Sequence, residues 1–193
     1  MSTKNNYVCP VEIAGSFDSR IRRWLQNPGR ILAPYVTEGK TALDVGCGPG
    51  FFSIELARLV GPAGRVIAAD LQQGMLDKLA GKIKGTDFST RIRLVKCDPS
   101  SLNVPEPVDF ILAFYMVHEV LDQPAFFREL FPILNEKGEF LLVEPKLFHV
   151  SRAQFRETIR HAEAAGFVSA PGPGLPFSWS AVLTKVPIGA TKQ

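Results

Sequence analysis

Several features that would indicate secretion, membrane insertion or a metal site are scarce or missing in this sequence of 193 residues. Its three cysteines, Cys9, Cys47 and Cys97, form no CxxC pair and have no histidines at ligand spacing, which argues against a disulfide framework and a zinc site. The N-terminus lacks an apolar signal core, and no run approaches 18 consecutive apolar residues. We therefore expect a cytoplasmic protein with no membrane span and no metal.

The charge is equally modest. The net charge is +3 and no block of five or six like charges occurs, so neither a nucleic-acid tail nor a polybasic membrane anchor is indicated. A chain of this length with 46% hydrophobic residues can bury one substantial core but not two. The sequence therefore predicts a single domain whose partner is a small molecule; it does not indicate an oligomeric state.

From residue 41 onward, short apolar runs alternate with amphipathic stretches, which is typical of an α/β fold with a mainly parallel sheet. The last two apolar runs have no helix between them and predict a hairpin with one antiparallel strand. Strands are expected at 41–46, 65–70, 92–97, 108–115, 138–145, 167–170 and 179–185.

Helix signals lie between these strands and before the first one. Asp122 with Pro124 predicts one helix start, and Ser151 with Gln154 forms a capping box for another helix, which ends at Gly166. In residues 1–40, an apolar stripe that includes Phe17 and Trp24 predicts a helical lid over a main domain at 41–193. The stripe consists of Phe17, Ile21, Trp24 and Leu25.

The first strand runs into "DVGCGPG", which places Asp44 just before three alternating glycines, Gly46, Gly48 and Gly50. The GxGxxG pattern of dinucleotide-binding proteins fails because its sixth position, counted from Gly46, is Phe51. The phosphate-loop pattern fails as well. Asp44 can either cap the turn or face a ligand; a carboxylate there would repel a pyrophosphate and attract an ammonium or sulfonium group. We favour a role in cofactor binding.

Asp70 ends the second strand 20 residues after Gly50, where an acid can accept hydrogen bonds from both hydroxyls of a ribose. A ligand with a ribose and a positive charge but no phosphate is S-adenosylmethionine. Together with "DVGCGPG", the stretch "VIAADLQQGML" resembles the class I S-adenosylmethionine-dependent methyltransferases, and the order of elements is similar to theirs from residue 41 to 185. The resemblance implies a Rossmann-like, doubly wound, seven-stranded sheet of order 3-2-1-4-5-7-6 with strand 7 antiparallel.

The same resemblance implies how the cofactor is held. The three glycines would line its methionine part and Asp70 would bind its ribose, while Leu71 and Met75 would enclose the adenine. Asp98 matches the position that receives the adenine amino group, although a plain turn residue before Pro99 is an equal reading. A backbone carbonyl near Ala113 or Phe114 would accept from the methionine ammonium.

Three further residues are the catalytic candidates: Tyr115, His118 and Glu144. All should lie where strands four and five end. His118 can serve as a proton acceptor if the methyl acceptor is a phenol, enol or amine, or it can simply pack beneath the lid. Tyr115 can orient the acceptor or form the pocket wall. Methyl transfer depends chiefly on placing the nucleophile in line in a dry pocket, so a base is optional.

The sequence therefore predicts a methyltransferase that uses S-adenosylmethionine and modifies a small, apolar or aromatic acceptor. Two alternatives stay open. One is a nicotinamide-dependent oxidoreductase, which the missing sixth-position glycine disfavours. The other is an adaptor that binds the cofactor without catalysis, which the intact loop and Asp70 disfavour.

Overall fold

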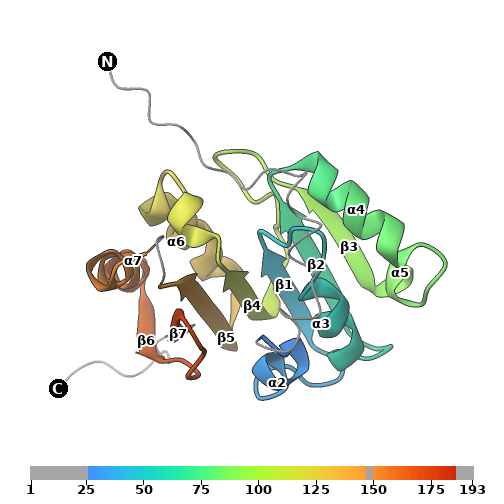
Figure 1. Cartoon of the computed structure of the whole chain (residues 1–193), viewed down its shortest axis with the longest axis horizontal. Helices are drawn as coiled ribbons and strands as arrows, with labels where there is room; N and C mark the ends of the chain where they lie inside the picture. The colour runs from blue at the N-terminus through green and yellow to red at the C-terminus, as the bar shows by residue number, and fades with distance from the viewer. Residues whose placement is uncertain (1–25, 147–149, 186–193) are drawn as a thin grey trace.

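A computed structural model describes residues 26–146 and 150–185, which form a central sheet flanked by helices (Figure 1). In this part of the chain the sheet has seven strands in the order β3-β2-β1-β4-β5-β7-β6. β7 is antiparallel to both of its neighbours, and the other neighbouring strands are parallel. The predicted fold is confirmed. The strands are β1 (Thr41–Val45), β2 (Arg65–Asp70), β3 (Ile92–Lys96), β4 (Val108–Phe114), β5 (Leu134–Pro145), β6 (Phe167–Pro171) and β7 (Ser178–Lys185).

Helices cover both faces of the sheet (Figure 1), and an apolar core lies against each face. On one face, Ile31, Leu56 and Leu79 from three helices pack in the core that contains Ala42 of β1. On the other face, residues of α6 and α7 pack in the core that contains Leu43. The helices are α2 (Pro28–Leu32), α3 (Ser53–Leu59), α4 (Gln73–Ile83), α5 (Phe88–Arg91), the 3₁₀ turn η2 (Val117–Glu119), α6 (Gln123–Ile133) and α7 (Arg152–Ala164). None of the described helices is long and apolar enough to cross a membrane.

Local signals account for most element boundaries. Asp122 caps α6, and Ser151 with Gln154 forms the predicted capping box of α7. The other strand boundaries agree with the expected ones to within one residue, but β5 begins at Leu134 and not at residue 138, because Leu134 pairs with Val108 before an irregularity in the register. The polar residues 135–137 interrupt the apolar pattern and conceal this first part of the strand.

The parallel order determines where the candidate site lies. β1, β2, β4 and β5 all end at the same edge of the sheet, here called the carboxyl edge. The glycine loop (residues 46–50) follows β1, Asp70 ends β2, His118 follows β4, and Glu144 lies near the end of β5. The lid residues Phe17 and Trp24 lie outside the described residues, as does Cys9.

Candidate active site

The glycine loop turns the chain sharply at the end of β1. Gly46, Gly48 and Gly50 have φ values of +67°, +53° and +86°, a region that side chains other than glycine rarely adopt. The backbone N–H of Gly46 donates to the carbonyl of Ala69 in β2 at 2.8 Å. The loop is thus attached to the strand that carries Asp70.

The surroundings of the three glycines differ. A Cβ atom on Gly50 would lie 2.2 Å from Cδ1 of Leu79, and one on Gly46 would lie 2.9 Å from Met116. A Cβ on Gly48 would meet no atom within 4 Å. Gly46 and Gly50 therefore permit close packing within the protein, whereas Gly48 presents bare backbone to open space.

Asp44 lies beneath this loop with only 2% of its surface exposed. Its Oδ2 atom accepts a hydrogen bond from the hydroxyl of Ser53, at 2.5 Å, and Ser53 is fully buried at the start of α3. The carboxylate therefore connects the end of β1 to α3. Its negative charge can act on a ligand through the loop, while direct contact is restricted by burial.

Both carboxylate oxygens of Asp70 accept backbone hydrogen bonds. Its Oδ2 atom accepts from the N–H of Gly48 and its Oδ1 atom from the N–H of Gln72, both at 2.8 Å. A carboxylate has about four acceptor positions, so these two bonds leave capacity for one more donor on each oxygen. Burial raises the pKa of Asp70, against the opposing effect of these two hydrogen bonds and of Lys96.

The residues predicted to enclose the adenine lie near Asp70 but differ in exposure. Leu71 is 40% exposed, whereas Met75 is buried in α4. The Lys96 ammonium donates to the carbonyl of Leu71 at 2.6 Å and so fixes the backbone there. Asp98 is exposed, and it accepts from the side-chain amide of Asn103 at 3.0 Å.

The end of β4 carries an aromatic cluster. Ala113 and Phe114 are buried, and the Phe114 ring lies 4.3 Å from that of Phe52 and 4.5 Å from that of Tyr115, between centroids. Tyr115 has a φ of +61°, which is rare for an aromatic residue. The chain therefore turns abruptly between the strand and His118.

The Tyr115 hydroxyl lies within a hydrogen-bond network. The side-chain amide of Gln26 donates to this hydroxyl at 2.9 Å. The hydroxyl also lies 2.5 Å from that of Ser178, which donates to the carbonyl of Pro176 at 3.0 Å. With the Ser178 proton directed to Pro176, Tyr115 is the donor in its bond to Ser178. The network joins residue 26, the end of β4 and the start of β7.

His118 and Glu144 form a close pair. Nδ1 of His118 lies 2.5 Å from Oε2 of Glu144, and Oε1 of Glu144 accepts from the N–H of Val117 at 2.8 Å. Glu144 is 1% exposed, whereas the His118 side chain is 23% exposed. The buried carboxylate thus fixes the imidazole in orientation, with the other edge of the ring directed away from Glu144.

Two opposing effects set the pKa of His118. Burial disfavours the imidazolium and lowers the pKa, while the hydrogen bond and charge of Glu144, with the charge of Glu119, raise it. The result is a pKa above the ordinary histidine value. The pair can therefore accept and hold a proton near neutral pH.

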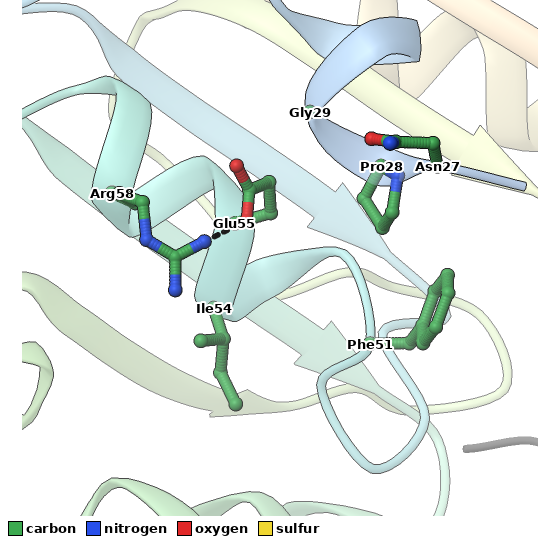
Figure 2. Close-up of a pocket in the computed structure, with 7 residues that line it drawn as sticks. All are labelled: Asn27, Pro28, Gly29, Phe51, Ile54, Glu55 and Arg58. Atoms are coloured by element: carbon green, nitrogen blue, oxygen red, sulfur yellow. Dashed lines mark hydrogen bonds and ion pairs between the residues drawn. The ribbon is translucent and has the colours of Figure 1, made fainter. Parts of the chain in front are cut away.

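A cavity of about 220 Å³ lies elsewhere, between the start of α2 and α3 (Figure 2). In Figure 2, Phe51 and the Asn27–Pro28 segment lie on one side of it, and the ion pair of Glu55 with Arg58 lies on the other. None of the predicted site residues lines it. Among the described residues, no group of three or more His, Cys, Asp or Glu side chains is arranged to hold a metal ion.

Sequence reasoning placed the cofactor and catalytic candidates at one edge but missed three of their supports. Ser53, Gln26 and Ser178 hold Asp44 and Tyr115 in place. Ser53 could have been found, because it lies at the first turn of the helix after the glycine loop. Gln26 and Ser178 are distant from Tyr115 in sequence, and no local pattern indicates their contact.

Comparisons with known proteins agree with this arrangement. The family described as a methyltransferase domain matches residues 42–138. A demethylmenaquinone methyltransferase of Lactobacillus johnsonii is 33% identical over 110 residues, which cover 56% of this chain and 45% of that protein. A ubiquinone/menaquinone biosynthesis C-methyltransferase of Pasteurella multocida is 29% identical over 110 residues, which cover 56% of this chain and 41% of that protein. This chain thus matches less than half the length of these relatives.

The fold is also that of solved methyltransferase structures. A protein of Aquifex aeolicus described as a SAM-dependent methyltransferase superposes with a TM-score of 0.80 at 23% identity, over 92% of this chain and 99% of that one. At this identity the likeness shows the fold alone, and the sequence family comes from the match over residues 42–138. The family match agrees with the predicted cofactor, S-adenosylmethionine, and disfavours the nicotinamide alternative. This chain belongs to the methyltransferase-domain family, as its glycine loop and Asp70 predicted.

Proposed function

We propose that this chain transfers a methyl group from S-adenosylmethionine to a small apolar or aromatic acceptor that loses a proton in the reaction. The observation that carries the proposal is that the His118–Glu144 pair lies at the same edge of the sheet as the glycine loop and Asp70. One set of residues suits the cofactor, and the other suits proton removal.

The described residues fit the cofactor. Gly48 presents open backbone, and Asp70 can accept from both ribose hydroxyls while it holds the N–H groups of Gly48 and Gln72. Leu71 offers an exposed apolar side chain beside the ribose position, with Met75 beneath it in the helix that follows. When bound, S-adenosylmethionine supplies an electrophilic methyl group on a sulfonium.

The chain's own contribution to the reaction is positioning and proton removal. Glu144 engages Nδ1 of His118, so we assign the proton of the acceptor to Nε2. The imidazolium that forms is stabilised by the Glu144 carboxylate, which is buried and therefore weakly screened. We assign to the packed rings of Phe114 and Tyr115 the role of an apolar wall that limits water where the acceptor and the methyl meet.

The relatives support an acceptor of this class, because one is a demethylmenaquinone methyltransferase and another is a ubiquinone/menaquinone biosynthesis C-methyltransferase. We also propose that residues 1–40 cover the site as a lid. The hydrogen bond from Gln26 to Tyr115 supports this, because it brings one residue of that segment to the carboxyl edge. Cytoplasmic location remains a prediction from the sequence.

The experiment is methyl incorporation from labelled S-adenosylmethionine into a panel of hydroxyaromatic compounds, including 1-naphthol and 1,4-naphthohydroquinone. We expect turnover of at least one acceptor by the full chain, and a loss of about 100-fold or more in His118→Ala. The variant should still bind S-adenosylhomocysteine. Normal turnover by His118→Ala at every pH would exclude the proton-acceptor role.

A further inference from the structure

Exposed apolar residues gather at the carboxyl edge. In the described ranges, four large hydrophobic residues have strongly exposed surfaces: Leu71, Leu121, Val168 and Phe177. Val168 lies in the edge strand β6, away from the carboxyl edge. Leu71 directly follows β2 and Phe177 directly precedes β7, while Leu121 lies in the connection from β4 to α6 at the same edge. Leu71 is assigned to the adenine. Leu121, at 80% exposed, and Phe177, at 62%, have no place yet in the proposed function.

Phe177 directly adjoins the catalytic candidates. It immediately precedes Ser178, whose hydroxyl contacts that of Tyr115 at 2.5 Å. Its carbonyl accepts from the N–H of Lys146, two residues after Glu144, at 2.8 Å. The bond to its own carbonyl and the bond made by the next residue therefore hold the backbone of Phe177 at the end of β5.

The backbone of Phe177 is also in an unfavourable conformation. Its φ is +55°, in a region that costs a side chain other than glycine about 1–2 kcal/mol. Folding gains little in return, because the ring remains mostly in solvent. Strained backbone conformations cluster at active sites and ligand-binding positions. An exposed aromatic ring on such a backbone, next to the candidate site, suggests that the ring contacts a ligand.

Leu121 lies in the connection between β4 and α6, and β4 is the neighbour of β5 on the other side from β7. It lies three residues after His118 and just before Asp122, whose carboxylate caps α6 by accepting from the N–H of Ala125 at 2.9 Å. The cap fixes the backbone beside Leu121 while its side chain projects into solvent. Leu121 follows β4 and Phe177 precedes β7, and β5 with Glu144 lies between those two strands.

We propose that Leu121 and Phe177 hold the apolar body of the methyl acceptor on either side of the His118–Glu144 pair and so select apolar acceptors. In the strand order, β5 with Glu144 lies between β4 and β7, so an acceptor bound over Glu144 has Leu121 on the β4 side and Phe177 on the β7 side. The chemistry at the pair rests on the proposed function. The apolar contact does not need turnover and can be measured as binding.

The test is calorimetric titration of 1-naphthol into the full chain saturated with S-adenosylhomocysteine. Leu121→Ser and Phe177→Ser should each weaken binding about tenfold, as expected for the loss of a buried large apolar side chain. Val168→Ser, which removes an exposed apolar residue of β6, should stay within twofold of the wild type. Phe177→Gly relieves the backbone strain, so this variant should be at least as stable as the wild type. It should nevertheless bind 1-naphthol as weakly as Phe177→Ser does.

Two outcomes would overturn the inference: no measurable 1-naphthol binding by the wild type, or unchanged affinity for 1-naphthol in both Leu121→Ser and Phe177→Ser. Neither outcome would affect the proposed reaction, which is tested by the turnover of His118→Ala. Conversely, normal turnover of that variant would remove the proton acceptor and leave the tenfold binding losses at Leu121 and Phe177 in place. The two failures are therefore distinguishable.

Discussion

Oε2 of Glu144 lies 2.5 Å from Nδ1 of His118, although the two residues are 26 positions apart in the chain. The contact exists because β4 and β5 are parallel neighbours that end at the same edge. The other oxygen of Glu144 accepts from the N–H of Val117, so the carboxylate fixes both the backbone and the ring of this segment. The pair is the feature of the site that most directly suggests acid–base chemistry.

Replacement of Glu144 by glutamine should change the pH dependence of turnover. The raised pKa of His118 means that the wild-type rate falls as the pH decreases through a value above that of an ordinary histidine, because the protonated ring cannot accept a proton. Glu144→Gln removes the charge that raises this pKa, so the acid limb of the kcat profile should move to lower pH. The maximal kcat should fall as well, because the weaker base and altered tautomer are less effective.

The matched control is Glu119→Gln, which removes a more weakly contributing charge and should shift the limb less. An acid limb that is unchanged in Glu144→Gln would show that the pair does not set the pH dependence. Cofactor affinity should stay near the wild-type value in both variants, since neither residue lies beside Asp70 or the glycine loop.

Alanine substitutions at two glycines should separate folding from cofactor binding. Gly48→Ala meets only the backbone penalty of its positive φ, about 1–2 kcal/mol of unfolding free energy. Gly50→Ala adds a clash with Leu79 that costs a further ~1–3 kcal/mol. Thermal denaturation should therefore rank Gly50→Ala as the less stable protein.

Calorimetry on Gly48→Ala then tests the open face of the loop. Because its new methyl group would occupy the space assigned to the cofactor, this folded variant should bind S-adenosylhomocysteine much more weakly than the wild type. Wild-type affinity in Gly48→Ala would place the cofactor somewhere else.

Asp70 should make cofactor binding depend on pH. Its carboxylate must be ionised to accept from both ribose hydroxyls, and its pKa is raised by burial. Affinity for S-adenosylhomocysteine should therefore fall on acidification at a higher pH than an ordinary aspartate would give. Asp70→Asn should weaken binding by about 10- to 100-fold at neutral pH and should abolish this acid-side dependence. A variant that retained the same pH dependence would assign it to another group.

Tyr115→Phe should affect stability more than chemistry. It removes the hydroxyl that Gln26 and Ser178 contact, at a cost of about 1 kcal/mol in the free energy of unfolding. Tyr35→Phe is a suitable control, because Tyr35 contributes through ring stacking on Phe110. Chemical denaturation measures both effects. If Tyr115→Phe lost turnover as completely as His118→Ala, the tyrosine would have a direct role in catalysis.

The fold was predictable because local patterns along the chain agree with the global topology. Each central strand is a continuous apolar run, and signals such as Asp122 or the Ser151–Gln154 box mark the helix starts. The start of β5 was not predictable, since Leu134 joins the sheet through a register shift that polar residues conceal.

Only the site residues that lie at strand ends could be predicted from the sequence. The position of Asp70 and of the glycines follows from β1 and β2 alone. The contact of His118 with Glu144 requires the strand order, and the bond from Gln26 to Tyr115 spans 89 positions with no periodic signal. The exposure of Phe177 depends on a positive φ that its sequence neighbours do not specify.

The central claim is that the glycine loop and Asp70 form a site for S-adenosylmethionine. Calorimetric titration of the full chain with S-adenosylhomocysteine and, separately, with NADH tests it most directly. We predict saturable binding of S-adenosylhomocysteine that Asp70→Ala abolishes, and no binding of NADH. Tight binding of NADH with no heat from S-adenosylhomocysteine would contradict the account.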